Sequence, residues 1–82
     1  MTDVLATGAT IGILGGGQLG RMLSVAASRL GFKTHIFEPG HNPPAGDVAH
    51  RITTAAYEDE TVLRAFAADV DVITFELSLI HI

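Results

Sequence analysis

The 82-residue sequence has no cysteine and no tryptophan, and its five Lys and Arg residues are outnumbered by nine Asp and Glu. Without cysteine, the chain can have neither a disulfide framework nor a thiolate that serves as nucleophile or metal ligand. The net charge of −4, with few and dispersed cations, argues against a surface that binds nucleic acid or an anionic membrane.

Long hydrophobic runs are also missing, because no apolar stretch approaches the length of about 18 residues that crosses a bilayer. Asp3 stands where a secretory signal would carry Lys or Arg, which argues against export. We therefore expect a cytoplasmic protein whose partners include neither nucleic acid nor membrane. A hydrophobic content of 48% and a charged content of 17% are typical of a folded globular chain.

Glycine, by contrast, is plentiful, and the nine glycines help to mark the ends of the predicted elements. Strands are predicted at residues 9–14, 34–38, 51–54 and 71–76, and helices at residues 18–30 and 58–70. The first helix carries an apolar stripe with helical spacing, formed by Leu19, Met22, Leu23, Ala26 and Leu30. Gly31 follows it where a left-handed cap is expected, and three acids open the second helix.

Strands that alternate with helices predict parallel pairing through right-handed crossovers, and hence an α/β fold with a Rossmann-like parallel sheet and flanking helices. Only two substantial helices are available to cover both faces of that sheet. We therefore expect a truncated domain, with residues 1–9 as a flexible leader and residues 10–76 as an incomplete Rossmann-like domain. Residues 77–82 are expected to be a non-native tail.

The segment from Gly15 to Gly20 satisfies the pattern G-x-G-x-x-G, with a predicted strand before it and a helix after it. Glycines permit a tight turn in which a phosphate approaches main-chain N–H groups, and the helix adds a positive dipole end. The alternative is a tight turn that binds nothing. Glu38, 21 residues after Gly17, is either a ribose-binding acid or a solvated carboxylate at a strand end.

These features leave three functions open. The first is the nucleotide-binding half of an NAD(P)-dependent oxidoreductase, and the second is a non-catalytic regulatory domain that binds a nucleotide. The third is part of a ligase, and it depends on a resemblance. Residues 15–22, Gly-Gly-Gly-Gln-Leu-Gly-Arg-Met, resemble the start of the 5-(carboxyamino)imidazole ribonucleotide synthases, which are ATP-grasp ligases of purine biosynthesis.

The resemblance extends over residues 10–76 and includes residues 31–34, 43–45 and 71–76. Its specific elements are the Gln-Leu-Gly-Arg-Met continuation of the glycine loop and the Thr-Phe-Glu end of the last strand. Related formyl-transferring ligases usually carry another residue in place of Gln18, so the carboxylating enzyme is favoured.

The resemblance implies an enzyme that uses ATP, Mg²⁺ and bicarbonate to carboxylate the exocyclic amine of 5-aminoimidazole ribonucleotide. Its N-terminal, pre-ATP-grasp domain would bind the ribonucleotide and would not hold a dinucleotide. The substrate-binding residues implied for this chain are Gly15, Gly16, Gly17, Gln18, Leu19 and Glu76. Backbone N–H groups of residues 16–19 would surround the 5′-phosphate, and Glu76 would accept hydrogen bonds from the amine.

By the same resemblance, the ATP and Mg²⁺ sites lie outside these residues, and the whole enzyme is a homodimer. No catalytic residue and no metal ligand are expected in this segment, so that the chain alone should lack ligase activity. Arg21 is interpreted as a solvated helix residue or a second contact to the phosphate. Residues 77–82 depart from the family and look like an in-frame translation of a sequencing adapter.

Overall fold

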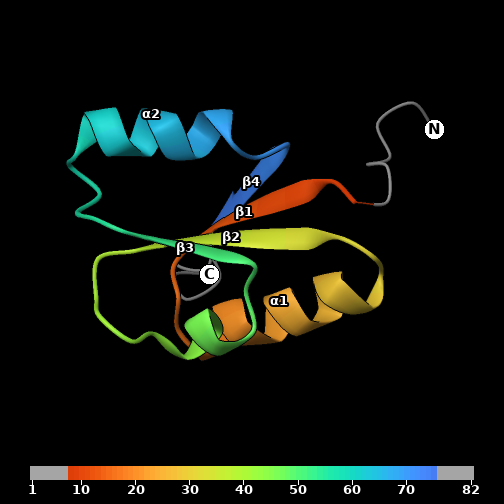
Figure 1. The fold of residues 1–82 in the computed structure, drawn as a ribbon. Coiled ribbons are helices and arrows are strands. Elements are labelled where there is room, and N and C mark those ends of the chain that lie inside the picture. Colours follow the sequence, from red (N-terminus) through yellow and green to blue (C-terminus); the bar gives the residue numbers. More distant parts are fainter. Residues whose placement is uncertain (1–7, 76–82) are drawn as a thin grey trace.

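The computed structural model describes residues 8–75, which form a four-stranded parallel sheet between helices (Figure 1). The strands lie in the order β3-β2-β1-β4. Their bounds are β1 Thr10–Leu14, β2 Lys33–Glu38, β3 Arg51–Thr54 and β4 Val72–Phe75; the helices are α1 Gln18–Arg29, the 3-10 helix η1 Pro44–Asp47 and α2 Glu60–Ala68. The predicted α/β fold with a Rossmann-like parallel sheet is confirmed. Glu76 and the predicted tail lie outside the described residues.

One face of the sheet is aliphatic and is covered by α1 and η1 (Figure 1). Ile13 of β1 pairs in register with Ile36 of β2, and both side chains are buried. Ala45 of η1 completes the buried cluster, and Leu23 of α1 packs against it. This face therefore depends on the close contact of α1 and η1 with the central strands.

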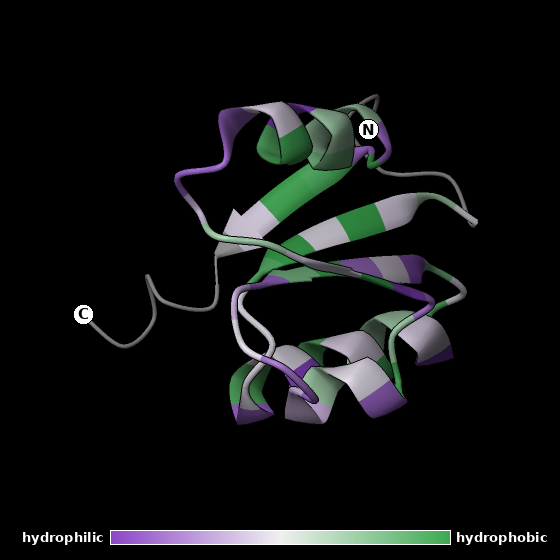
Figure 2. Ribbon diagram, turned by 60° about the vertical axis from the view of Figure 1, so that its left-hand side comes forward, coloured by the Kyte–Doolittle hydropathy of each residue, from purple (hydrophilic) through white to green (hydrophobic). Residues whose placement is uncertain are grey.

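The opposite face is aromatic and is covered by α2. Phe37 of β2 stacks on Tyr57 with ring centroids 5.5 Å apart. It also makes an edge-to-face contact with Phe66, with ring centroids 5.3 Å apart. Phe66, the buried side chain of α2, also makes an edge-to-face contact with His35, with ring centroids 4.7 Å apart. Figure 2 shows apolar residues along the strands between the two helical layers. The aromatic cluster thus fixes α2 above the two central strands.

The side of α1 that is buried differs from the predicted stripe. Small residues face the sheet, since the buried residues of α1 are Gly20, Ser24 and Ala27. Met22 and Leu30 of the predicted stripe are 65% and 70% exposed. Leu23 of the stripe does pack against the core, so the stripe and the contact face overlap only in part. The small side chains between helix and sheet allow the close packing that protein interiors require.

The predicted left-handed cap at Gly31 is confirmed, whereas α2 is shorter than predicted, because it begins at Glu60 and ends at Ala68. Gly31 has a φ of +88° after α1, in the left-handed region that glycine adopts without strain. At the start of α2, the Asp59 carboxylate accepts a hydrogen bond of 3.2 Å from the Val62 N–H group. Such a cap satisfies an amide that has no partner within the helix.

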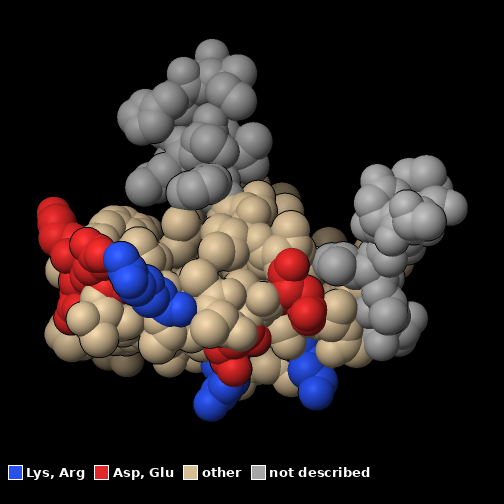
Figure 3. Space-filling model, turned by 90° about the horizontal axis from the view of Figure 1, so that it is seen from above, with Lys and Arg blue, Asp and Glu red and all other residues tan. Residues whose placement is uncertain are grey.

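Charges of both signs are interspersed on the α2 side of the molecule (Figure 3). Exposed acids gather at the start of α2, where Glu58, Asp59 and Glu60 are consecutive, and Glu60 pairs with Arg64 at 2.6 Å. Neither helix within residues 8–75 combines the length and the apolar character needed to cross a membrane.

Gly12 sets how closely α2 approaches β1, and this contact is testable by substitution. A Cβ atom at Gly12 would lie 2.9 Å from Phe66 Cζ and 2.9 Å from Val70 Cγ2. We expect Gly12→Ala to lower the free energy of unfolding by about 1–3 kcal/mol through overpacking. Urea titration of Gly12→Ala, Val70→Ala and the double variant provides the measurement. The double variant should recover part of the loss, and strict additivity of the two losses would contradict the contact.

Candidate functional site

The candidate site is the turn that joins β1 to α1, at the carboxyl edge of the sheet. Gly15 leaves β1 with a φ of +122°, and its N–H group donates to the Phe37 carbonyl at 2.9 Å. A side chain at this φ would be strained, so the turn requires glycine there. Gly17 is the N-cap of α1, which begins at Gln18.

The start of α1 offers backbone donors to an anion. The first main-chain bond of the helix runs from the Arg21 N–H group to the Gly17 carbonyl at 3.0 Å, so the N–H groups of residues 18–20 have no partner within the helix. The glycine N-cap supplies no side-chain oxygen to them, and the first turn carries no acidic residue. Uncapped amides and a positive dipole end together favour a bound anion.

Glu38 connects this turn to the loop that follows β2. One carboxylate oxygen, Oε1, accepts a hydrogen bond of 2.7 Å from the Gly16 N–H group. The other, Oε2, accepts one of 2.9 Å from the Gly40 N–H group. The Gly16 amide is therefore engaged by a carboxylate within the protein, and a phosphate at this turn would depend on the amides further along the chain.

A pocket of about 190 Å³ opens beside the turn, and its lining includes Gly16, Gly17, Glu38, His41, Asn42 and Pro43. The loop after β2 forms one wall. Arg21 holds the far end of that loop, since its Nη1 donates to the Pro44 carbonyl at 3.3 Å and lies 3.5 Å from Asp47 Oδ2. The carboxyl edge of the sheet thus has a small cavity beside the glycine turn.

Five of the six predicted substrate-binding residues fall within this turn. Gly15, Gly16, Gly17, Gln18 and Leu19 form the link from β1 into the first turn of α1. The sixth, Glu76, lies outside the described residues. Phe75, just before it, pairs with Leu14 in the parallel register of β4 and β1. The last described residue therefore lies at the edge of the sheet from which the glycine loop starts.

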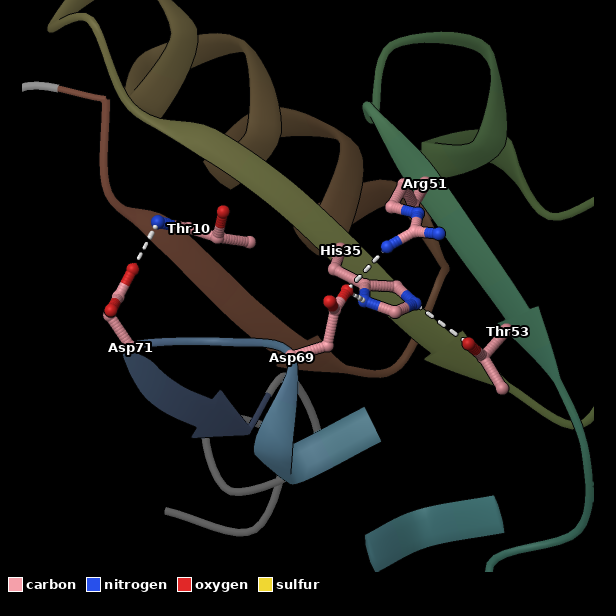
Figure 4. A network of polar contacts seen from close by, with 6 residues as sticks. All are labelled: Thr10, His35, Arg51, Thr53, Asp69 and Asp71. Carbon is pink, nitrogen blue, oxygen red and sulfur yellow. Dashed lines mark hydrogen bonds and ion pairs between the residues drawn. The ribbon is translucent and has the colours of Figure 1, made fainter. Parts of the chain in front are cut away.

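A second polar cluster lies on the α2 side of the sheet and was missed by the sequence reasoning (Figure 4). His35 is buried, its Nδ1 is 3.1 Å from Asp69 Oδ2, and its Nε2 is 2.7 Å from Thr53 Oγ1. Arg51 Nη1 donates to the same Asp69 oxygen at 2.7 Å. Sequence spacing gives no signal for this Asp–His–Thr row, because the parallel pairing of β2 and β3 brings Thr53 near His35 and the end of α2 supplies Asp69.

The cluster perturbs His35. Burial lowers the pKa of the imidazole below its usual 6.5, and Asp69 opposes the shift by raising it. A pocket of about 300 Å³ adjoins the ring. Within residues 8–75, no three His, Cys, Asp or Glu side chains are grouped as a metal ion would need.

Comparison with known proteins identifies a family that contains this fold. Residues 8–82 match the ribonucleotide synthetase preATP-grasp domain. A curated relative, the N5-carboxyaminoimidazole ribonucleotide synthase of Brucella melitensis, is 56% identical over 72 residues, which are 88% of this chain and 20% of the relative.

Solved structures agree with this match. An N5-carboxyaminoimidazole ribonucleotide synthetase in complex with ADP superposes with a TM-score of 0.87 at 42% identity, over 93% of this chain and 20% of the other. The Aspergillus clavatus synthase in complex with ADP and 5-aminoimidazole ribonucleotide gives a TM-score of 0.74 at 33% identity, over 85% and 19%. The chain therefore spans about a fifth of the length of these relatives.

The lowered pKa of His35 predicts how stability depends on pH. A neutral imidazole is favoured in the folded chain, so the unfolded chain binds the proton first as the pH falls. The free energy of unfolding should be fully retained above the usual pKa of 6.5 and should decrease as the pH falls below it.

Urea titrations between about pH 7.5 and pH 5 measure this dependence. His35→Gln should flatten the dependence, whereas His50→Asn, a change at an exposed histidine, should keep it. A wild-type stability that increases as the pH falls through this range would contradict the burial of a neutral His35.

Proposed function

Since the chain belongs to the ribonucleotide synthetase preATP-grasp family, we propose that it forms the ribonucleotide-binding part of an ATP-dependent carbon–nitrogen ligase. In this proposal the whole enzyme carboxylates the exocyclic amine of 5-aminoimidazole ribonucleotide with bicarbonate, as a step of purine biosynthesis. The relatives support the reaction, because they are N5-carboxyaminoimidazole ribonucleotide synthases. One of them was solved with both ADP and 5-aminoimidazole ribonucleotide.

The observation that carries the proposal is the uncapped start of α1 at the carboxyl edge of the sheet. Ligands of open α/β sheets bind at that edge, and a phosphate is the anion that a glycine turn and a helix N-terminus accommodate. In the proposal, the backbone of Gly17, Gln18 and Leu19 surrounds the 5′-phosphate, while Gly15 and Gly16 shape the turn. This part of the chain binds and orients the substrate and performs no chemistry of its own.

Glu76 is proposed to accept hydrogen bonds from the exocyclic amine of the ribonucleotide. Glu76 directly follows Phe75 in the sequence, and Leu14, the partner of Phe75, lies directly before the glycine turn. A carboxylate acceptor at that position would orient the amine that becomes carboxylated. The phosphate and the amine would then be held from two neighbouring strand ends.

The oxidoreductase alternative is less well supported by the site. It needs an acid at the end of the second strand whose carboxylate accepts a hydrogen bond from a ribose hydroxyl. Glu38 stands there, but both of its oxygens accept main-chain N–H groups, from Gly16 and Gly40. A regulatory domain that binds without turnover would use the same turn, and it differs from the ligase only in the activity of the whole protein.

ATP belongs to the proposal as the second substrate, and solved relatives were crystallised with ADP. The described residues do not supply a site for Mg²⁺, since they contain no group of three potential ligands. Mg²⁺, bicarbonate and a homodimeric enzyme remain part of the proposal on the resemblance alone, and a cytoplasmic location remains part of it on the composition and the N-terminal sequence. So do the boundaries of the domain at residues 10–76, with a leader before it and a tail after it.

Titration of the ¹⁵N-labelled chain distinguishes the two nucleotide-binding functions. We expect 5-aminoimidazole ribonucleotide to shift the amide signals of Gly17, Gln18 and Leu19 in a saturable way, because a phosphate there changes their hydrogen bonding. NAD should leave these signals unchanged at the same concentrations. Saturable shifts with NAD and none with the ribonucleotide would contradict the proposed function.

Gly17→Val tests whether the turn itself binds the phosphate. The backbone at Gly17 has φ −75° and ψ −163°, which valine adopts readily, so the fold should persist. The branched side chain adds bulk beside the first helical amides, and the affinity for the ribonucleotide should fall at least about tenfold, roughly the effect of losing one charged hydrogen bond. Undiminished affinity in the same titration would show that the turn is only a connection between strand and helix.

A further inference from the structure

Glu38 is the charged group at the junction of the glycine turn and the loop after β2. It ends β2 and is half-buried. Its two oxygens accept from amides that belong to different loops, at 2.7 Å from Gly16 and 2.9 Å from Gly40. Hydrogen bonds to an ionised carboxylate are about twice as strong as those between neutral groups. The carboxylate therefore joins the two loops that border the candidate phosphate site.

The junction leaves no room for a side chain at Gly16. A Cβ atom on Gly16 would lie 2.7 Å from Pro43 Cβ and 3.2 Å from Glu38 Cβ. The Gly16 carbonyl also accepts a hydrogen bond of 2.9 Å from the Ala45 N–H group. The amide and the carbonyl of Gly16 are thus both hydrogen-bonded, and there is no space beside it for a side chain. The position of Gly16 therefore sets where the following amides of the turn lie.

We propose that Glu38 is a positioning residue for the ribonucleotide phosphate: it holds Gly16 so that the amides at the start of α1 face the ligand. The inference rests on the proposed function. Glu38 does not itself bind the phosphate, because two anions repel and its oxygens already accept main-chain donors. Its role is to fix the shape of the turn and the wall of the pocket formed by His41 and Asn42.

The chemistry of the carboxylate matters because both partners are donors. Glutamine at position 38 has one oxygen that can accept and one amino group that can only donate. One of the two glycine amides would then face another donor, so the junction would lose a bond and gain a repulsion. Aspartate keeps the charge and both acceptors but is one methylene shorter, and it should reach only one of the amides.

Glu38→Gln and Glu38→Asp in the ¹⁵N-labelled chain test the proposal, with 5-aminoimidazole ribonucleotide as the probe. In Glu38→Gln we expect the amide signals of Gly16 and Gly40 to shift and to exchange faster with solvent. The dissociation constant of the ribonucleotide should increase about tenfold, the factor that corresponds to the loss of one charged hydrogen bond. Glu38→Asp should lie between Glu38→Gln and the wild type.

Two controls separate positioning from charge and from general stability. Glu58→Gln removes the same charge at an exposed residue before α2, and it should keep the wild-type affinity. Gly12→Ala strains the opposite face of the sheet, where a Cβ would meet Phe66, and it should lower stability without changing the dissociation constant. A purely structural role of Glu38 would not produce this difference.

The outcomes are distinguishable. Equal affinity in Glu38→Gln and the wild type, or tighter binding after loss of the charge, would overturn the positioning role and leave the proposed function intact. Failure of the wild type to bind the ribonucleotide would contradict the proposed function instead. If Glu38→Gln unfolds, the dissociation constant of the ribonucleotide in Glu38→Asp decides whether Glu38 positions the turn. Loss of the fold in both variants would overturn the proposal, because Glu38 would then serve the fold.

Discussion

The hydrogen bonds of the Glu38 carboxylate to the Gly16 and Gly40 amides are the contact on which the candidate site at the carboxyl edge of the sheet depends. They join the turn after β1 to the loop after β2, and the Ala45 N–H group adds a second link to the Gly16 carbonyl. With the turn fixed in this way, α1 begins at a defined point and directs its first amides along the carboxyl edge of the sheet.

The two faces of the sheet contribute differently to this arrangement. On the α1 side, Gly20, Ser24 and Ala27 allow the helix to lie close to the strands, so its N-terminus stays near the edge. On the α2 side, Phe37 and Phe66 form an aromatic layer, and the polar cluster of His35 lies beside it. The glycine turn and the His35 cluster thus depend on opposite faces of the same two central strands.

Much of this was predictable from the sequence, and the failures have physical causes. Glycines and prolines marked the ends of the elements, and alternating strands and helices predicted the parallel sheet. The buried face of α1 was not predicted, because small residues such as Ser24 carry no hydrophobic signal. Nor could spacing reveal the partners of Glu38 or His35, since His35 meets Thr53 only through the register of β2 and β3.

The proposed function depends above all on the binding of the ribonucleotide phosphate by the first amides of α1. A crystal structure of the chain with 5-aminoimidazole ribonucleotide tests it most directly. We expect phosphate oxygens within about 3 Å of the backbone nitrogens at the start of α1, with the Glu38 bond to Gly16 retained. A phosphate bound elsewhere, for example in the pocket beside His35, would contradict it.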